Sequence, residues 1–394
     1  MSTAVATTAI QPFQFEAPKP DLDDLRGRIN ATRWPPRETV KDASQGVQLG
    51  LLQELARYWG SEYDMGRLAS RLNAVPQFTT EIDGLRIHFI HVKSPNQNAL
   101  PLIITHGWPG SVVEMLDAIG PLTDPTAHGG RAEDAFDLVL PSVPGYGFSA
   151  EPTELGWFAG RVAQAWPELM HRLGYSRYVA QGGDVGAAVT DAMGRQAPEG
   201  LIGIHTNLFV PGLAGGSFPT ETDEERTAAA AGATFRATGF GYFVEQATRP
   251  QTIGYALLDS PVALAAWMLD HDTDSYYKIS RAFVDGNLTR KSIVDNITLY
   301  WLTGTGASAA RWYWEFGQVL AAASAAGKAP PTVSVPVGFT TFPGEIWAAP
   351  RSWVETVYPG LAYFNEVDRG GHFAAWEEPQ LFSEELRAAF ASVR

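Results

Sequence analysis

The sequence predicts a doubly wound α/β fold, in which a mostly parallel sheet is interrupted by a helical insertion. Three observations support this prediction. Apolar runs alternate with helical segments up to residue 211, the alternation stops over residues 212–329, and it resumes after residue 330. Strands that are buried on both faces are apolar throughout, so these runs indicate a parallel sheet covered by helices on both sides. Helices inserted between two late strands are expected to cover the carboxyl ends of the strands, where ligands bind in such sheets.

The composition indicates a globular enzyme-like chain. With 394 residues, of which 45% are hydrophobic and 18% charged, the chain is long enough for one large core with an added unit. The net charge of −14 argues against a nucleic-acid or anionic-membrane partner. The absence of cysteine excludes disulfides, thiolate metal sites and a cysteine nucleophile.

The amino-terminal residues predict neither export nor membrane insertion. Residues 1–10 have no basic region followed by an apolar one, so no signal peptide is expected. No stretch approaches 18 uninterrupted apolar residues. We therefore expect a soluble, cytoplasmic protein.

Residues 1–77 are predicted to form a mostly helical extension that wraps the core. Apolar residues recur at helical spacing within residues 47–60. A hairpin follows, with strands at residues 78–82 and 85–92 joined by the Asp83-Gly84 turn. The hairpin begins the predicted α/β core, which comprises residues 78–211 and 330–394.

The remaining elements are predicted from their periodicity. Core strands are expected at residues 100–105, 136–141, 177–181, 201–209, 333–342 and 361–367. Core helices are expected at residues 156–173 and from the turn after residue 181 to about residue 196. The insertion, residues 212–329, is predicted to be a lid with helices at residues 227–239, 241–247, 261–269, 292–302 and 307–325.

The most informative motif is the sequence Gly-Gly-Asp-Val-Gly at residues 182–186, which directly follows an apolar strand. Small residues around a central nucleophile are typical of a nucleophile elbow, a sharp turn between a strand and a helix. Here the central residue is Asp184. A carboxylate at this position forms an alkyl ester by attacking saturated carbon, which points to strained ethers or carbon–halogen bonds. The alternative is a glycine-rich turn whose solvated aspartate caps the following helix.

Two further residues complete a catalytic order. Glu345 follows the strand at residues 333–342, and His372 follows the strand at residues 361–367. Nucleophile, acid and histidine, each after a strand, appear in this order in α/β-hydrolases. His372 would activate water, and Glu345 would fix its tautomer and stabilise the imidazolium. The alternatives are a histidine in a surface loop and a capping carboxylate.

These segments together resemble the epoxide hydrolases of the microsomal type. The resemblance covers nearly the whole chain, because residues 13–92 also resemble the amino-terminal extension of that family. The matching segments are residues 33–35 (RWP), 106–111 (HGWPGS), 182–184 (GGD), 248–257 (TRPQTIGYAL), 259–262 (DSPV), 342–345 (FPGE) and 370–377 (GGHFAAWE).

The resemblance implies further site residues. Two lid tyrosines, Tyr242 and Tyr313, would donate hydrogen bonds to the epoxide oxygen as an alkoxide develops on it; without the resemblance, both would be read as packing residues. The backbone N–H groups of Trp108 and Val185 would form the oxyanion hole. Relatives often carry tryptophan after the nucleophile, so Val185 leaves the shape of the pocket wall open. His106 lies in the oxyanion turn and is a poor candidate for the base.

The sequence thus predicts a cofactor-independent epoxide hydrolase that converts a small-molecule epoxide and water into a vicinal diol. No metal site is expected, since His88 and His91 would lie on opposite faces of a strand. A haloalkane dehalogenase and a non-catalytic ligand-binding homologue are the alternatives. The dehalogenase is disfavoured by Val185 and Trp108, at positions where that class often carries tryptophan and asparagine. A homodimer is expected from the family alone.

Overall fold

The computed structural model describes residues 8–213, 216–270, 289–326, 331–346 and 348–394. Residues 1–7, which belong to the segment predicted to lack an export signal, lie outside these ranges. The predicted boundary between lid and core at residues 329 and 330 also lies outside them. In the described part of the chain, no helix is long and apolar enough to cross a membrane.

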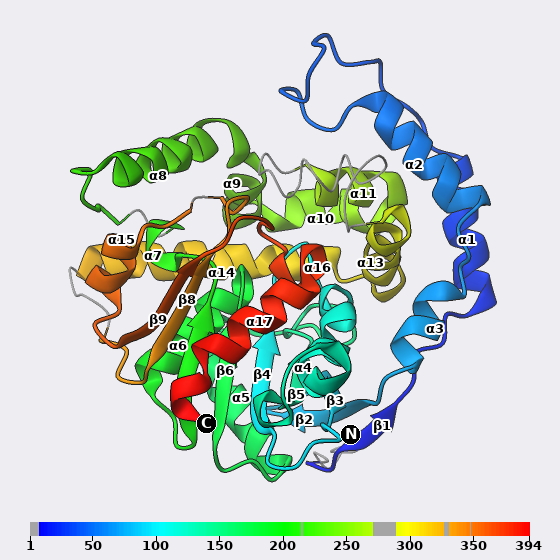
Figure 1. Ribbon diagram of the computed structural model, residues 1–394. Coiled ribbons are helices and arrows are strands. Elements are labelled where there is room, and N and C mark those ends of the chain that lie inside the picture. Colours follow the sequence, from blue (N-terminus) through cyan, green and yellow to red (C-terminus); the bar gives the residue numbers. More distant parts are fainter. Residues whose placement is uncertain (1–7, 214–215, 271–288, 327–330, 347) are drawn as a thin grey trace.

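One mixed sheet forms the centre of the molecule (Figure 1). Its strand order within the described residues is β1-β2-β3-β5-β4-β6-β7-β8-β9. The pairs from β1 to β5 are antiparallel, and all pairs from β5 to β9 are parallel. The strands are β1 (Gln11–Phe13), β2 (Gln77–Ile82), β3 (Leu85–Val92), β4 (Leu100–Thr105), β5 (Phe136–Pro141), β6 (Tyr178–Gly182), β7 (Leu201–Thr206), β8 (Val337–Thr341) and β9 (Leu361–Glu366).

Helices cover both faces of this sheet, as the apolar strands predict. On one face, α5 (Ala159–Arg172) packs against α6 (Val185–Gln196), and α6 also contacts β4, β6 and β7. On the other face, α4 (Ile119–Thr123) and α17 (Pro379–Ala389) contact each other and the strands beneath them. The short helix α15 (Arg351–Val357) follows β8 and contacts β9, and α16 (Ala374–Glu377) follows β9 and contacts α17. The predicted mostly parallel sheet is thereby confirmed.

Two predicted strands end earlier or start later than expected. β7 stops at Thr206 because the Thr206 hydroxyl oxygen accepts a hydrogen bond from the N–H of Leu208 and closes a turn (3.3 Å). β8 begins only at Val337, directly after Pro336, which has no N–H to donate to a neighbouring strand. Buried apolar side chains extended the first prediction, since Leu208 and Phe209 are buried, whereas in the described residues just before β8 only Val333 is buried.

The amino-terminal helices run along one side of the molecule, from the lid to the edge of the sheet (Figure 1). They are α1 (Lys19–Asn30), α2 (Leu49–Ser61) and α3 (Arg67–Asn73). The predicted apolar stripe of α2 is buried at Leu52, Leu55, Tyr58 and Trp59. Trp59 donates a hydrogen bond from its ring to Thr298 of the lid (2.9 Å). This extension therefore contacts lid helices as well as the sheet.

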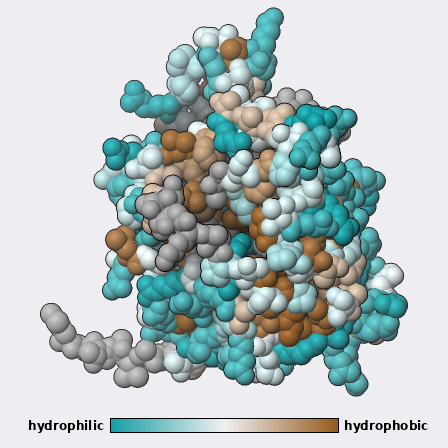
Figure 2. Space-filling model, turned by 90° about the vertical axis from the view of Figure 1, so that its left-hand side faces the viewer, coloured by the Kyte–Doolittle hydropathy of each residue, from teal (hydrophilic) through white to brown (hydrophobic). Residues whose placement is uncertain are grey.

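The lid lies across the carboxyl ends of the parallel strands (Figure 1). Its described helices are α7 (Val210–Leu213), α8 (Asp223–Thr234), α9 (Gly241–Thr248), α10 (Pro250–Asp259), α11 (Pro261–Leu269), α13 (Arg290–Thr303) and α14 (Gly306–Ala326). The helix α10 was not among the predicted ones, although Pro250 occupies its first turn, where proline is favoured. The predicted helix at residues 227–239 ends in a π-helical turn, Phe235–Gly239. On the face that carries α8 and α15, hydrophobic residues form separate groups among hydrophilic ones (Figure 2).

Candidate active site

Four strands deliver the candidate site residues to one edge of the sheet. The turn with Trp108 follows β4, Asp184 follows β6, Glu345 follows β8, and His372 follows β9. Because these strands are parallel neighbours, their carboxyl ends lie together. Residues up to 264 positions apart in the sequence are thereby brought into contact.

Asp184 sits on a strained turn between β6 and α6. Its φ of 50° and ψ of −123° lie outside the regions that residues with side chains ordinarily adopt. The turn fits only because its neighbours are glycines. A Cβ on Gly186 would stand 1.8 Å from the carbonyl oxygen of Thr105. The Asp184 side chain makes no capping bond to α6, which removes the interpretation as a helix cap.

His372 connects Asp184 with Glu345. Its Nδ1 lies 2.5 Å from Oε1 of Glu345, and its Nε2 lies 3.4 Å from Oδ2 of Asp184. The same Glu345 oxygen accepts the N–H of Ile346 (2.8 Å), which holds the carboxylate in place. All three carboxylate and imidazole groups are largely or fully buried. The geometry fits a histidine whose Nδ1–H is held by the acid while Nε2 faces the nucleophile.

The two carboxylates control the charge of His372. Burial lowers the pKa of His372, but the charges and hydrogen bonds of Glu345 and Asp184 outweigh it and raise this pKa well above its ordinary value. The imidazole is therefore protonated while Asp184 is an anion. Esterification of Asp184 would remove its share of this effect and favour a neutral imidazole.

The turn after β4 places a backbone donor on the nucleophile. The N–H of Trp108 donates to Oδ1 of Asp184 over 2.7 Å. Val185 is the first residue of α6, directly after Asp184. His106 is buried, its Nδ1–H donates to the carbonyl of Gly107 (3.1 Å), and its Nε2 accepts the N–H of Val143 (3.2 Å). Burial lowers the pKa of His106 to about 4, so it is a neutral scaffold residue.

The lid helix α13 holds this turn from the outside. Asn296 accepts a hydrogen bond from the Ser111 hydroxyl and donates one to the carbonyl of Pro109, and each bond is 2.6 Å long. The Tyr300 hydroxyl donates to the carbonyl of Gly110 (2.6 Å). All three bonds are buried, so the position of the Trp108 N–H depends on α13. Nothing in the sequence around residues 296–300 indicated this role.

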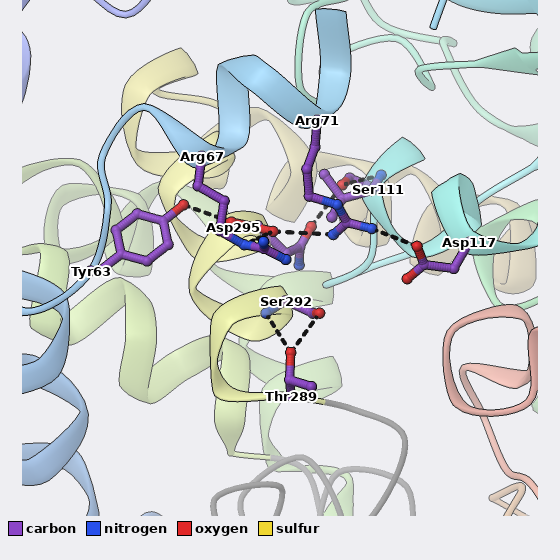
Figure 3. A network of polar contacts seen from close by, with 10 residues as sticks. Tyr63, Arg67, Arg71, Ser111, Asp117, Thr289, Ser292 and Asp295 are labelled. Atoms are coloured by element: carbon purple, nitrogen blue, oxygen red, sulfur yellow. Dashed lines mark hydrogen bonds and ion pairs between the residues drawn. The ribbon is translucent and has the colours of Figure 1, made fainter. Parts of the chain in front are cut away.

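Asp295, the residue before Asn296, connects α13 to the amino-terminal extension (Figure 3). The carboxylate of Asp295 is fully buried. It accepts hydrogen bonds from Tyr63, Arg67 and Arg71, with lengths of 2.7, 3.2 and 3.1 Å. Arg71 also pairs with Asp117 (2.8 Å), which follows the turn in the sequence. The extension, the lid and the segment after β4 therefore meet in one ionic network.

The two predicted tyrosines lie together in the lid, above Asp184. Tyr242 of α9 and Tyr313 of α14 are buried, with ring centroids 6.0 Å apart. Burial, followed by the charges of Asp184 and Glu345, raises the pKa of Tyr242 well above its ordinary value, so its phenol remains a donor. Both tyrosines and Asp184 line one cavity of about 20 Å³, whose other walls are apolar: Val185, Ala188, Val210, Phe243, Trp312, Phe316 and Ile346.

A larger cleft adjoins this cavity. It has a volume of about 770 Å³ and lies between the segment at residues 144–157 and the lid helices α10 and α14. Trp312 lines both the cleft and the cavity, so the two spaces adjoin at this residue. The cleft therefore lies next to the cavity that contains the lid tyrosines.

Three buried polar residues near Asp184 were missed by the sequence analysis. Glu114, Gln181 and Asn207 line a second small cavity together with Asp184 and His372. Glu114 stands among apolar neighbours and Gln181 ends an apolar run, which is the signal that could have drawn attention to them, whereas Asn207 follows two other polar residues.

Comparison with known proteins decides the family. A family model described as the epoxide hydrolase N terminus matches residues 10–115. Epoxide hydrolase 1 of Sus scrofa is 37% identical over 413 aligned positions, which cover 98% of this chain and 89% of that protein. The chain belongs to the epoxide hydrolase family. A candidate epoxide hydrolase of Stigmatella aurantiaca is 50% identical over 387 positions, covering 98% and 86% of the two chains.

Solved structures of epoxide hydrolases share the fold. Aspergillus niger epoxide hydrolase superposes with a TM-score of 0.84 at 32% identity, covering 99% of this chain and 98% of that one. Juvenile hormone epoxide hydrolase from the silkworm Bombyx mori gives a TM-score of 0.85 at 29% identity, covering 98% and 95%. The predicted α/β-hydrolase fold and the predicted family are therefore both confirmed.

Proposed function

We propose that this epoxide hydrolase opens its substrate through a covalent ester of Asp184, which water activated by His372 and Glu345 then hydrolyses. The observation that carries the proposal is the buried chain of contacts from Glu345 through His372 to Asp184, beneath two buried phenols. The substrate is a small epoxide, and the product is a vicinal diol.

In the first half-reaction, a carboxylate oxygen of Asp184 attacks an epoxide carbon and breaks its bond to the ring oxygen. The ring oxygen develops negative charge and becomes an alkoxide. An alkoxide is far too basic to be a leaving group at neutral pH without a donor. Tyr242 and Tyr313 stabilise it by donating hydrogen bonds from their phenols, and one of them gives it a proton. The resulting phenolate takes up the proton that the His372 imidazolium releases, so the imidazole becomes neutral. The outcome is a hydroxyalkyl ester on a neutral Asp184.

In the second half-reaction, His372 takes a proton from water through Nε2 as the water oxygen adds to Cγ of Asp184. The backbone N–H groups of Trp108 and Val185 stabilise the resulting oxyanion. Glu345 stabilises the imidazolium without taking its proton. When the tetrahedral intermediate collapses, the imidazolium protonates the departing diol oxygen, and Asp184 keeps the oxygen from water. The second proton of that water, left on the Asp184 carboxyl, passes to His372 and restores the initial carboxylate and imidazolium.

Two features favour this reaction over halide release. A dehalogenase needs donors for a departing halide, whereas phenols over the nucleophile suit an oxygen that must gain a proton. Val185 stands where the indole donor of a dehalogenase is often found. The apolar walls around the phenols suit an apolar epoxide, and the cleft beyond Trp312 suits substituents that extend from it.

Isotope labelling in heavy-oxygen water tests the proposal. After a single turnover, the diol should contain no heavy oxygen, because both of its oxygens come from the epoxide and from Asp184. The label should be found in Asp184, and it should reach the diol only in later turnovers. Label in the diol of the first turnover would indicate direct attack by water and would overturn the covalent mechanism. A panel of styrene-type, aliphatic and polycyclic epoxides identifies the preferred substrate class.

A further inference from the structure

Asp184 lies between two distinct cavities. The cavity beneath the lid contains the two tyrosines and apolar side chains. The other cavity, also about 20 Å³, has a lining that, in the described part of the chain, comes from the core: Gly107, Glu114, Met115, Gln181, Gly183, Asp184, Asn207, His372, Phe373, Ala374, Ala375 and Phe382. Among the described residues, only Asp184 lines both.

The core cavity, unlike the one beneath the lid, is rich in polar groups. Gln181 and Glu114 are 1% and 5% exposed, and Asn207 is 3% exposed. Gln181 donates a hydrogen bond from its amide to Oδ1 of Asn207 (3.1 Å). The side-chain amide oxygen of Gln181 and Oε2 of Glu114 have no hydrogen-bond partner among the described residues. A buried polar atom left in this state is costly, which points to a small polar occupant.

Water fits this cavity by size and by chemistry. A single buried water requires about 10–15 Å³ and two to four polar partners. The cavity provides the required space, the free amide oxygen of Gln181, the carboxyl of Glu114 and the imidazole of His372. An epoxide is too large for it and would have to displace its apolar walls.

We propose that this core cavity holds the water that hydrolyses the Asp184 ester, and that Gln181 and Glu114 are its positioning residues. The proposal rests on the function proposed above and identifies where its second substrate binds. Water then attacks Cγ of Asp184 from the core, while the alkyl group of the ester stays beneath the lid. One proton of the water passes to Nε2 of His372, and Gln181 accepts a hydrogen bond from the other.

Glu114 contributes as a neutral group. Burial, followed by the negative charge of Asp184, raises the pKa of Glu114 to about 8, so its carboxyl is protonated at neutral pH. A second anion beside Asp184 is thereby avoided, and the O–H group can donate to the water. Gly110 makes room for this arrangement, because a Cβ there would stand 1.9 Å from Oε2 of Glu114.

The test measures the two half-reactions separately, with styrene oxide as the first probe and the fastest epoxide of the panel as the second. Mixing at enzyme excess followed by acid quench gives the ester as a mass increase of the protein, and its rates of formation and decay. Gln181→Met removes the acceptor at nearly constant shape. It should slow ester decay about 10-fold, the effect of one lost hydrogen bond, while ester formation stays within about 3-fold of the unmodified protein.

Two further variants separate positioning from folding. Glu114→Gln keeps a neutral group that donates and accepts, and should retain ester decay, whereas Glu114→Leu should slow it about 10-fold. Gln77→Met is the matched control, since Gln77 is a buried glutamine of β2 at the other end of the sheet. It should leave both rates unchanged.

The outcomes distinguish this inference from the proposed function. If ester decay is unchanged in both Gln181→Met and Glu114→Leu, or if Glu114→Gln is as slow as Glu114→Leu, the core cavity does not position the water. If His372→Gln accumulates no ester on either probe, the covalent mechanism itself is wrong. Equal slowing of formation and decay in Gln181→Met would show a general distortion of the site and would also overturn the inference.

Discussion

Single side chains divide the proposed reaction into two steps that can be measured apart. His372 contacts Asp184 through Nε2 and Glu345 through Nδ1, and the proposal assigns it to the water step. Tyr242 and Tyr313 lie on the lid side of Asp184, where the proposal assigns them to ring opening. Substitutions of these residues should therefore affect different half-reactions.

We expect His372→Gln to form the ester and to fail to hydrolyse it, because the base acts only on water. The ester should accumulate as a stable mass increase of the protein. Glu345→Gln should slow the same step less, since the imidazole remains but is held less well. His171→Gln, on the exposed end of α5, is the matched control and should behave like the unmodified protein. Loss of ester formation in folded His372→Gln would contradict the assignment.

The tyrosines should act on ring opening. A hydrogen bond to a developing alkoxide is worth on the order of 1.5–3 kcal/mol, so Tyr242→Phe and Tyr313→Phe should each lower the alkylation rate roughly 10- to 100-fold. The double variant should nearly abolish ring opening and still hydrolyse a preformed ester. Tyr255→Phe is the control, because Tyr255 is a lid tyrosine that is 70% exposed.

An unchanged opening rate in the double variant would make both tyrosines packing residues. It would also reopen the dehalogenase alternative. Release of bromide from a short alkyl bromide is the direct measurement for that activity.

At the scale of elements, α13 is the support of the active site. It contacts the turn after β4 through Asn296 and Tyr300, and the amino-terminal extension through Asp295. When a buried carboxylate that accepts several hydrogen bonds is removed, its donors lose their partner. The stability of this junction and the position of the Trp108 N–H should therefore change together.

We expect Asp295→Asn to lower the free energy of unfolding by roughly 2–3 kcal/mol, because Arg67 and Arg71 lose their buried partner but retain some solvent. Urea unfolding measures this change. Asp24→Asn breaks an exposed pair with Arg28 and should lower the free energy of unfolding much less, because solvent screens both charges. Equal losses in the two variants would show that the network around Asp295 is no more important than a surface ion pair.

At the scale of the whole molecule, buried histidines make stability depend on pH. Burial lowers the pKa of His88 and of His205 to about 3, against an ordinary value of 6.5. Between these values the unfolded chain binds protons that the folded chain does not, so each histidine makes stability fall as the pH decreases below 6.5. Glu114 and Asp295, whose pKa values are raised, act in the opposite direction.

A variant isolates the contribution of one histidine. Below pH 6.5, His205 should contribute a slope of about 1.4 kcal/mol per pH unit. His205→Gln should therefore show a weaker pH dependence than the unmodified protein between pH 5 and 6, whatever its stability at pH 7. Urea unfolding at pH 5, 6 and 7 gives both slopes. Identical slopes would mean that His205 is protonated in the folded protein. The predicted homodimer and cytoplasmic location stay predictions at this scale.

The sequence by itself determined whatever depends on neighbouring residues. Apolar runs identified the parallel strands, since strands buried on both faces need no polar side chains. Gly182, Gly183 and Gly186 identified the turn around Asp184, because only small residues tolerate its close contacts. The order of Asp184, Glu345 and His372 after three strands indicated the site, since parallel strands end at one edge. The tyrosines needed the family resemblance, because their local sequence is that of any packed helix.

Only the tertiary structure decided which distant side chains meet. Gln181 lies on β6 and Glu114 beyond β4, and nothing in either segment indicates that both line a cavity with His372. The same holds for Asp295, whose partners Tyr63, Arg67 and Arg71 lie more than 220 positions away. Such contacts depend on how helices and strands pack in three dimensions. A pattern in the sequence records only the periodicity of each element, so it cannot specify them.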